Sequence, residues 1–142
     1  MTNPAPAEAT TRIATAVWPC LIFRDARASA DFLVRAFGFE LAALYAREGD
    51  PSVIEHGQLR WPLGGGVMFG SAGRDDSPFG RREPGTDLVY VVCDEPDELF
   101  ARATAAGAEV VRDLRDEDYG SRGFAVRDPE GNIWSFGTYR GE

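Results

Sequence analysis

Apolar positions change their spacing several times along the chain, and each change marks a boundary between predicted elements. The run Ala14–Phe23 is rich in β-branched and aromatic residues, which is typical of a β-strand. Asp25 follows where a helix N-cap residue would stand, and Gly38 stands where a glycine commonly ends a helix. Between them, apolar residues follow the i, i+3, i+4, i+7 spacing of an amphipathic helix: Ala30, Leu33, Val34 and Phe37. The opening therefore predicts a strand followed by a helix.

Shorter apolar runs separated by turn-forming Gly and Pro residues come next. They predict three strands, at Glu40–Tyr45, Val53–Trp61 and Gly66–Gly70. The segment Ser71–Gly85 that follows is rich in Gly, Pro, Arg and Asp and has no apolar period, so it predicts a linker. Ahead of the first strand, residues 1–12 are rich in Pro, Ala and Thr and predict a flexible N-terminal arm.

The same order of elements returns after the linker. Leu88–Cys93 predicts a strand, and Asp94 is expected to begin a helix that has Pro96 in its first turn and ends at Gly107. The apolar face of this helix consists of Leu99, Ala103 and Ala106. Three further strands are predicted, at Glu109–Arg112, Gly123–Arg127 and Asn132–Tyr139.

An internal repeat connects the two halves at an interval of 69 residues. The residues Asp25, Ala36, Gly38 and Glu40 recur as Asp94, Ala105, Gly107 and Glu109, at the start and stop signals of both helices. Each half therefore predicts one βαβββ module, with module one at about 13–70, the linker at 71–85 and module two at about 86–140. A single such module leaves one sheet face uncovered, and pairing two would enclose it. The predicted fold class is α+β, a single domain of two tandem βαβββ modules over residues 13–140.

The composition restricts the possible partners. The 142 residues include 15 Lys and Arg against 23 Asp and Glu, which gives a net charge of −8. This charge disfavours nucleic acid, whose binding depends on phosphate neutralisation, and an anionic membrane, whereas it attracts a cationic ligand. The sequence shows no signal peptide and no apolar stretch of about 18 residues, so we expect a cytoplasmic protein. Cys20 and Cys93 lack metal-ligand or redox spacing, which favours two buried free thiols.

Two segments carry a resemblance to a known family. They are VWPCLIFRDARASADFLVRAFGFE in the first half and DYGSRGFAVRDPEGNIWSFGTY at the end. The most specific part is the turn Arg127–Asn132, which is followed by an apolar strand. The chain resembles the vicinal oxygen chelate superfamily, which contains glyoxalase I, extradiol dioxygenases, and fosfomycin and bleomycin resistance proteins. The resemblance implies paired βαβββ modules that form a curled mixed sheet around a cavity, with the helices on the outer face.

The resemblance also implies positions for metal ligands, which in family enzymes are His, Gln or Glu on the first and last strands of each module. Counting seven residues back from Asp25 and Asp94, and seven forward from Asp128, leads to Trp18, Asp87 and Ser135. The matching position in module one is Phe69. Trp and Phe cannot bind a metal ion and Ser is a poor ligand, so one carboxylate remains. We therefore expect no metal site and no cofactor.

Strand alternation suggests which residues line the cavity. On the first strand Trp18, Cys20 and Ile22 would face it, while Val17, Leu21 and Phe23 would face the helix. In module two the cavity side is expected to hold Asp87, Val89, Val91, Ile133, Ser135 and Gly137, with Trp134 and Phe136 in the core. Trp18 and Phe69 are either aromatic walls of the pocket or ordinary core residues that fill it.

Polar residues on two other segments are candidate binding groups. Alternation places Ile54, His56, Gln58 and Arg60 on one face of a strand, where His56 and Gln58 are either pocket hydrogen-bonding groups or part of a solvated face. Tyr119 and Arg122 lie in a loop before a strand, where residues at the mouth of a cavity are often found.

Two classes of function remain open. The first is a metal-free small-molecule binding protein that sequesters a cationic aromatic antibiotic, as bleomycin resistance proteins do. The alternative is a glyoxalase-like lyase or isomerase with unusual metal ligands such as His56 and Asp87. Because family members commonly build their cavities at subunit contacts, a homodimer is expected.

Overall fold

The computed structural model describes residues 15–142, so the arm expected at 1–12 lies outside the described residues. In chain order its elements are β1 (Cys20–Phe23), α2 (Ala26–Phe37), β2 (Glu40–Arg47), β3 (Asp50–Arg60), β4 (Gly66–Ser71), the 3₁₀ helix η1 (Pro78–Arg81), β5 (Leu88–Val92), α3 (Pro96–Ala105), β6 (Glu109–Asp116), β7 (Arg122–Arg127) and β8 (Ile133–Gly137). Neither α2 nor α3 is long and apolar enough to cross a membrane.

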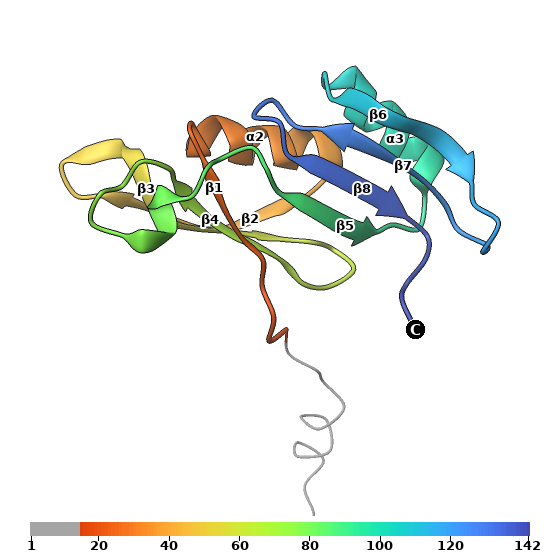
Figure 1. Ribbon diagram of the computed structural model, residues 1–142, viewed down its shortest axis with the longest axis horizontal. Coiled ribbons are helices and arrows are strands. Elements are labelled where there is room, and N and C mark those ends of the chain that lie inside the picture. Colours follow the sequence, from red (N-terminus) through yellow and green to blue (C-terminus); the bar gives the residue numbers. More distant parts are fainter. Residues whose placement is uncertain (1–14) are drawn as a thin grey trace, which may run out of the picture.

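The strands form two four-stranded mixed sheets, one for each module. The strand order is β1-β4-β3-β2 in the first sheet and β5-β8-β7-β6 in the second. In each sheet the first and last strands of the module pair in parallel, and the other pairs are antiparallel. Figure 1 shows the two sheets side by side along the long axis, and they do not close into a barrel. The predicted α+β fold of two tandem βαβββ modules is confirmed.

The first helix begins and ends where its sequence signals predict. The Asp25 side chain accepts a hydrogen bond from the Ala28 amide (3.1 Å), which satisfies one of the unpaired amides at the helix start. Gly38 ends α2 in the left-handed conformation, with φ of 94°, which glycine adopts without steric cost. The Arg102 guanidinium donates to two carbonyls in the last turn of α2, those of Val34 (3.1 Å) and Arg35 (2.9 Å), and so joins α3 to this end.

The second helix begins one residue later than the sequence repeat predicts. Its N-cap residue is Glu95, and Pro96 is its first residue, so the expectation for Asp94 is wrong. Pro96 explains the shift, because its ring restricts Glu95 to non-helical dihedrals and its missing N–H costs nothing at the first helical position. The structural repeat is therefore 70 residues at the start of the helices, and Asp25 corresponds to Glu95.

This offset changes which side chains of β5 face the helices. Val91 is buried with Trp134 and Phe136 in the common core, and Val89 packs against that core. Leu88 and Tyr90 point to the opposite face and are 68% and 45% exposed. Val89 and Val91 therefore lie on the helix side of the second sheet rather than on its open face, and Trp134 and Phe136 lie in the core as predicted.

Aromatic contacts join the two modules into one hydrophobic core. Phe37, Phe39 and Trp61 of module one pack against Trp134 and Phe136 of module two, with ring centroids 4.8–6.1 Å apart. Offset and edge-on contacts of this kind add to the free energy gained by burying the rings. The modules therefore pair within one chain, through the helix side of both sheets.

The turn Arg127–Asn132, which carries the family resemblance, makes two sets of structural hydrogen bonds. Asp128 accepts hydrogen bonds from the backbone and side-chain amides of Asn132 and from the Trp134 indole, which fixes the entry into β8. The carboxylate of Glu130 reaches module one, where it accepts from the backbone amides of Arg24 (2.6 Å) and Asp25 (2.8 Å) and from the Ser29 hydroxyl (3.0 Å). Glu130 thus provides a polar connection between the modules at the start of α2.

Candidate ligand-binding site

The helices cover one face of each sheet and leave the other face open. In the first sheet, strand pairing puts Cys20, Met68 and Gln58 in one row on this open face. A pocket of about 170 Å³ lies here and is lined by Cys20, Leu21, Ile22, Glu55, His56, Met68, Phe69, Gly70, Arg74, Phe79 and Arg82. We call it the first-sheet pocket. Of the predicted site residues it brings together Cys20, His56 and Phe69, and Gln58 lies next to it on the same face.

The segment between the modules forms the wall of the first-sheet pocket. Its Arg74 guanidinium donates to the carbonyl of Ser71 (2.6 Å) and also reaches Glu55. Arg82 donates to the carbonyl of Cys20 (2.8 Å), and Phe79 beside it is 71% exposed. The predicted linker therefore includes η1 and contributes pocket residues, which its irregular composition did not reveal.

Of the two alternatives for Phe69, the structure favours that of a core residue. Its ring lies over Gly57, where a Cβ atom would overlap it, and meets the Phe23 ring edge-on at 6.0 Å. At 3% exposed, Phe69 is a core residue, and the adjacent Met68 takes the place on the open face. The position that matches Ser135 is therefore Met68, one residue before the expected Phe69, and because strand side chains alternate, a shift of one residue reverses the face.

The open face of the second sheet has Tyr90 and Ser135 as directly paired neighbours. The Tyr90 hydroxyl donates to the carbonyl of Tyr139 (2.6 Å) and lies over Gly137, where a Cβ atom would come within 2.8 Å of it. Partial burial raises the pKa of Tyr90, so the phenol stays protonated at neutral pH. Sequence reasoning missed Tyr90, and the signal that could have found it is Pro96, which sets the 70-residue offset.

The donor positions of the metal enzymes can now be assigned from the structure. With Glu95 as the N-cap, the position equivalent to Trp18 is Leu88 rather than Asp87. Met68 corresponds to Ser135, since they pair with the equivalent residues Cys20 and Tyr90. The set is therefore Trp18, Met68, Leu88 and Ser135, which offers a thioether and a hydroxyl but no imidazole or carboxylate. Within residues 15–142 no three His, Cys, Asp or Glu side chains come together as a metal site either. These residues do not fit the divalent ion of the metal enzymes.

The other predicted site residues are separated from one another. Trp18 is half-buried just before β1. The Asp87 backbone amide donates to the buried Asn132 side chain (3.0 Å), which is a structural contact. Tyr119 is 64% exposed and meets Tyr139 edge-on at 5.7 Å. Arg122 is held by Asp97 (2.8 Å) and Asp116 (3.2 Å), which raise the pKa of its guanidinium and occupy it in ion pairs.

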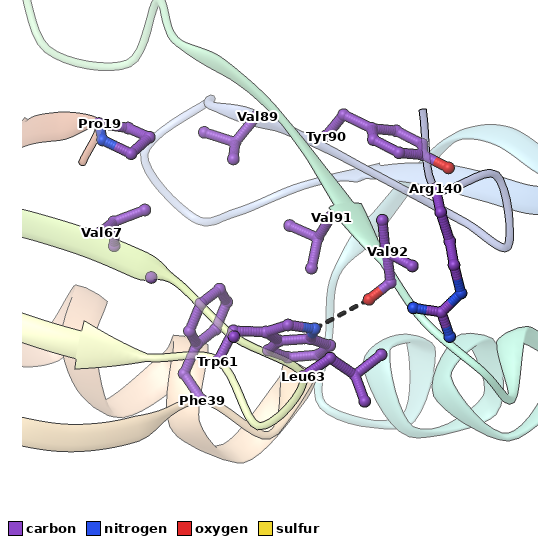
Figure 2. A pocket seen from close by; sticks show the side chains of 12 residues that line it. Pro19, Phe39, Trp61, Leu63, Val67, Val89, Tyr90, Val91, Val92 and Arg140 are labelled. Atoms are coloured by element: carbon purple, nitrogen blue, oxygen red, sulfur yellow. Dashed lines mark hydrogen bonds between the residues drawn. The ribbon is translucent and has the colours of Figure 1, made fainter. Parts of the chain in front are cut away.

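A larger pocket lies between the two modules, and Figure 2 shows it from close by. Its volume is about 340 Å³, and it is lined by Pro19, Phe39, Trp61, Leu63, Gly64, Gly66, Val67, Val89, Tyr90, Val91, Val92 and Arg140. We call it the inter-module pocket. The Trp61 indole donates to the carbonyl of Val92 (2.8 Å) across it, which fixes the ring as one wall. Of the predicted site residues it contains Val89.

Two paired βαβββ modules with open sheet faces define a protein of the vicinal oxygen chelate type. Residues 12–136 match the family model described as Glyoxalase/Bleomycin resistance protein/Dioxygenase superfamily. The chain belongs to this superfamily. It is also 34% identical over 131 residues to uncharacterized proteins of Mycobacterium bovis and Mycobacterium tuberculosis, which covers 86% of this chain and 82% and 73% of those proteins.

Solved structures of other proteins share the fold of this chain. TioX from Micromonospora sp. ML1 is 34% identical, with a TM-score of 0.70 over 86% of this chain and 98% of TioX. A superfamily member from Sphaerobacter thermophilus is 21% identical, with a TM-score of 0.65 over 88% of this chain and 97% of its own. At that lower identity the likeness concerns the fold alone.

Proposed function

We propose that this protein binds an organic small molecule on its open sheet faces without a metal ion. The observation that carries the proposal is the set of side chains at the four donor positions, which are Trp18, Met68, Leu88 and Ser135. Aromatic and thioether groups provide polarisable apolar surface for an organic ligand and no ligands for a divalent cation. Family membership makes sequestration of a ligand, as in bleomycin resistance proteins, the biological use we favour.

The ligand we propose is a cationic aromatic molecule. The first open face offers Met68 and the stacked pair of Tyr45 and His56, whose rings are 6.2 Å apart and inclined by 20°. Two arginines line this pocket: Arg74 is paired with Glu55, and Arg82 donates to the carbonyl of Cys20. We therefore expect the aromatic part of the ligand, rather than its cationic group, to enter the pocket. At longer range the net charge of −8 attracts a cation and increases its rate of encounter.

A positive charge introduced at the first-sheet pocket tests the ligand proposal. Bleomycin, a cationic antibiotic, is expected to raise the melting temperature of the wild-type protein, because a ligand that binds the native state stabilises it. Met68 is half-buried on the open face. The substitution Met68→Lys therefore places a cation there and is expected to abolish the bleomycin-induced rise in melting temperature. Leu41→Lys adds the same charge on the helix side of the same sheet, where Leu41 pairs with the core residue Leu59, and is expected to preserve it.

The two possible failures of this test have separate meanings. An equal bleomycin shift in wild type and Met68→Lys would move the ligand away from the first open face. Absence of a shift in wild type, together with turnover of the glutathione adduct of methylglyoxal, would replace the binding function with a glyoxalase-like activity.

We further propose that the protein is a homodimer in which a second copy covers the open face of the second sheet. The second open face and the loop beside it expose large apolar side chains that no element of the described chain covers: Leu88 (68%), Tyr90 (45%), Tyr119 (64%) and Tyr139 (38%). Clusters of this kind are typical of protein–protein interfaces. Light scattering is expected to give twice the monomer mass of 15.5 kDa, and Leu88→Lys is expected to lower that mass. A wild-type monomer at micromolar concentration would contradict the proposal.

A further inference from the structure

We propose that the inter-module pocket is a second binding site, and that it takes a flat aromatic molecule bearing a single negative charge, such as an aromatic carboxylate. This inference goes beyond the proposed function, because the inter-module pocket and the first-sheet pocket have no lining residue in common. Its volume of about 340 Å³ is sufficient for a small organic ligand.

The walls of the inter-module pocket favour a flat apolar group. Trp61 and Phe39 form its aromatic side, with ring centroids 4.8 Å apart, and Val67, Val89 and Val91 form the aliphatic side. Both aromatic rings are at least nine-tenths buried and belong to the common core, and the bond from the Trp61 indole to Val92 holds that ring in place. The site is therefore preformed, so a ligand does not have to order these rings.

The mouth of the pocket determines the sign of the ligand's charge. Arg140 is the one charged residue in the lining, and Figure 2 shows its side chain descending beside Val92 and Leu63. Its Nη2 atom is paired with Asp94, while the described hydrogen bonds leave Nε and Nη1 without an acceptor. These two groups lie on different edges of the guanidinium, so a ligand carboxylate can accept from either one of them, whereas a cation in the pocket would meet a like charge.

The exposure and pairing of Arg140 limit how strongly it favours an anionic ligand. The Arg140 side chain is 61% exposed and shares its charge with Asp94, so water and salt weaken its attraction for an anion. We therefore expect apolar burial to provide most of the affinity, and Arg140 to provide a preference of about two- to fivefold for the anion, as expected for an exposed ion pair.

Calorimetric titration with 2-naphthoate and 2-naphthamide tests the inference, since these planar probes differ in charge and hardly in shape. Wild-type protein is expected to bind both, with naphthoate about two- to fivefold tighter at low salt. Arg140→Gln is expected to remove this preference and to leave naphthamide binding unchanged. Naphthoate that fails to bind wild type, or an equal preference in Arg140→Gln, would overturn the inference.

A substitution that fills the inter-module pocket is the second part of the test. Val89→Phe places a larger side chain among the lining residues and is expected to weaken both probes at least tenfold. Met68→Phe adds similar bulk in the first-sheet pocket and serves as the matched control, with probe binding retained. If Val89→Phe binds like wild type, the inference is wrong. If Val89→Phe does not fold, as shown by its circular dichroism, the Arg140→Gln comparison decides alone. Neither arm depends on bleomycin, so the proposed function can fail independently.

Discussion

At the scale of single residues, the two cysteines illustrate how position controls chemistry. Cys93 is 5% exposed at the end of β5, where burial, with a smaller contribution from the Asp94 carboxylate, raises its pKa to about 11. Cys20 is exposed at the start of β1, contrary to the expectation of two buried thiols. The thiolate is the reactive form of cysteine, so burial and a high pKa both protect Cys93.

We predict that a thiol reagent such as dithionitrobenzoate modifies Cys20 and not Cys93 in the native protein at pH 8. Absorbance is expected to report a single reacting thiol per chain, and a second one only after denaturation. Cys20→Ser is expected to abolish the native reaction, and Cys93→Ser to preserve it. Two thiols that react at the same rate in the native protein would contradict this assignment.

Trp18 occupies a donor position of the metal enzymes and is half-buried. If it forms part of a ligand surface, Trp18→Ala lowers bleomycin binding by on the order of 1–3 kcal/mol, the value for a lost aromatic stack. The loss of unfolding free energy is then expected to stay below the roughly 3–5 kcal/mol typical of a buried Trp. Chemical denaturation beside a ligand titration measures both, with Val17→Ala as a control, since Val17 is 85% exposed. A large loss of stability with binding intact would show that Trp18 is a core residue.

At the scale of elements, one acidic side chain joins the β7–β8 turn to the start of α2. Glu130 accepts three hydrogen bonds there, two from backbone amides and one from the Ser29 hydroxyl. The N-terminal end of a helix favours negative charge, because its first amides have no acceptors within the helix. We therefore assign Glu130 a role in holding the two modules together.

Glu130→Ala is expected to lower the free energy of unfolding by about 1–3 kcal/mol, since three hydrogen bonds to a charged group are lost. Urea denaturation measures the change. The matched control is Glu83→Ala, because Glu83 is 75% exposed and the ion pair that it makes with Arg24 is long at 3.4 Å. The control is expected to change stability by less than about 0.5 kcal/mol. Equal effects of the two substitutions would remove the special role of Glu130.

The sequence predicted the order of helices and strands well, but it predicted less well which face of each strand is buried. The reasons are physical. Capping residues and the 3.6-residue period identify α2 and its ends, because they act within one helix. In Leu88–Val92 every residue is apolar or aromatic, so alternation cannot show which side faces the core. The face then depends on the offset between the modules, and Pro96 changes that offset by one residue. This single step places Leu88 and Tyr90 on the open face, in place of Asp87, Val89 and Val91.

At the scale of the whole molecule, two modules share one core and leave two open faces. The core lies on the helix side, where Phe37, Phe39 and Trp61 meet the aromatic residues of β8. The inter-module pocket follows from this arrangement, since it lies where β5 passes the β3–β4 hairpin. Sequence reasoning could not find this pocket, because its residues come from distant segments that meet only in the folded chain. The same holds for the pocket wall formed by Arg74, Phe79 and Arg82.

The central proposal is that the open faces bind their ligand without a metal ion. Its most direct test is elemental analysis of the untagged protein for zinc, nickel, manganese and iron, after purification without chelators. Trp18, Met68, Leu88 and Ser135 lack the nitrogen and carboxylate ligands of a catalytic metal, so the content of each metal is expected to be far below one ion per chain. One ion of any of these metals per chain, retained through dialysis, would contradict the proposal.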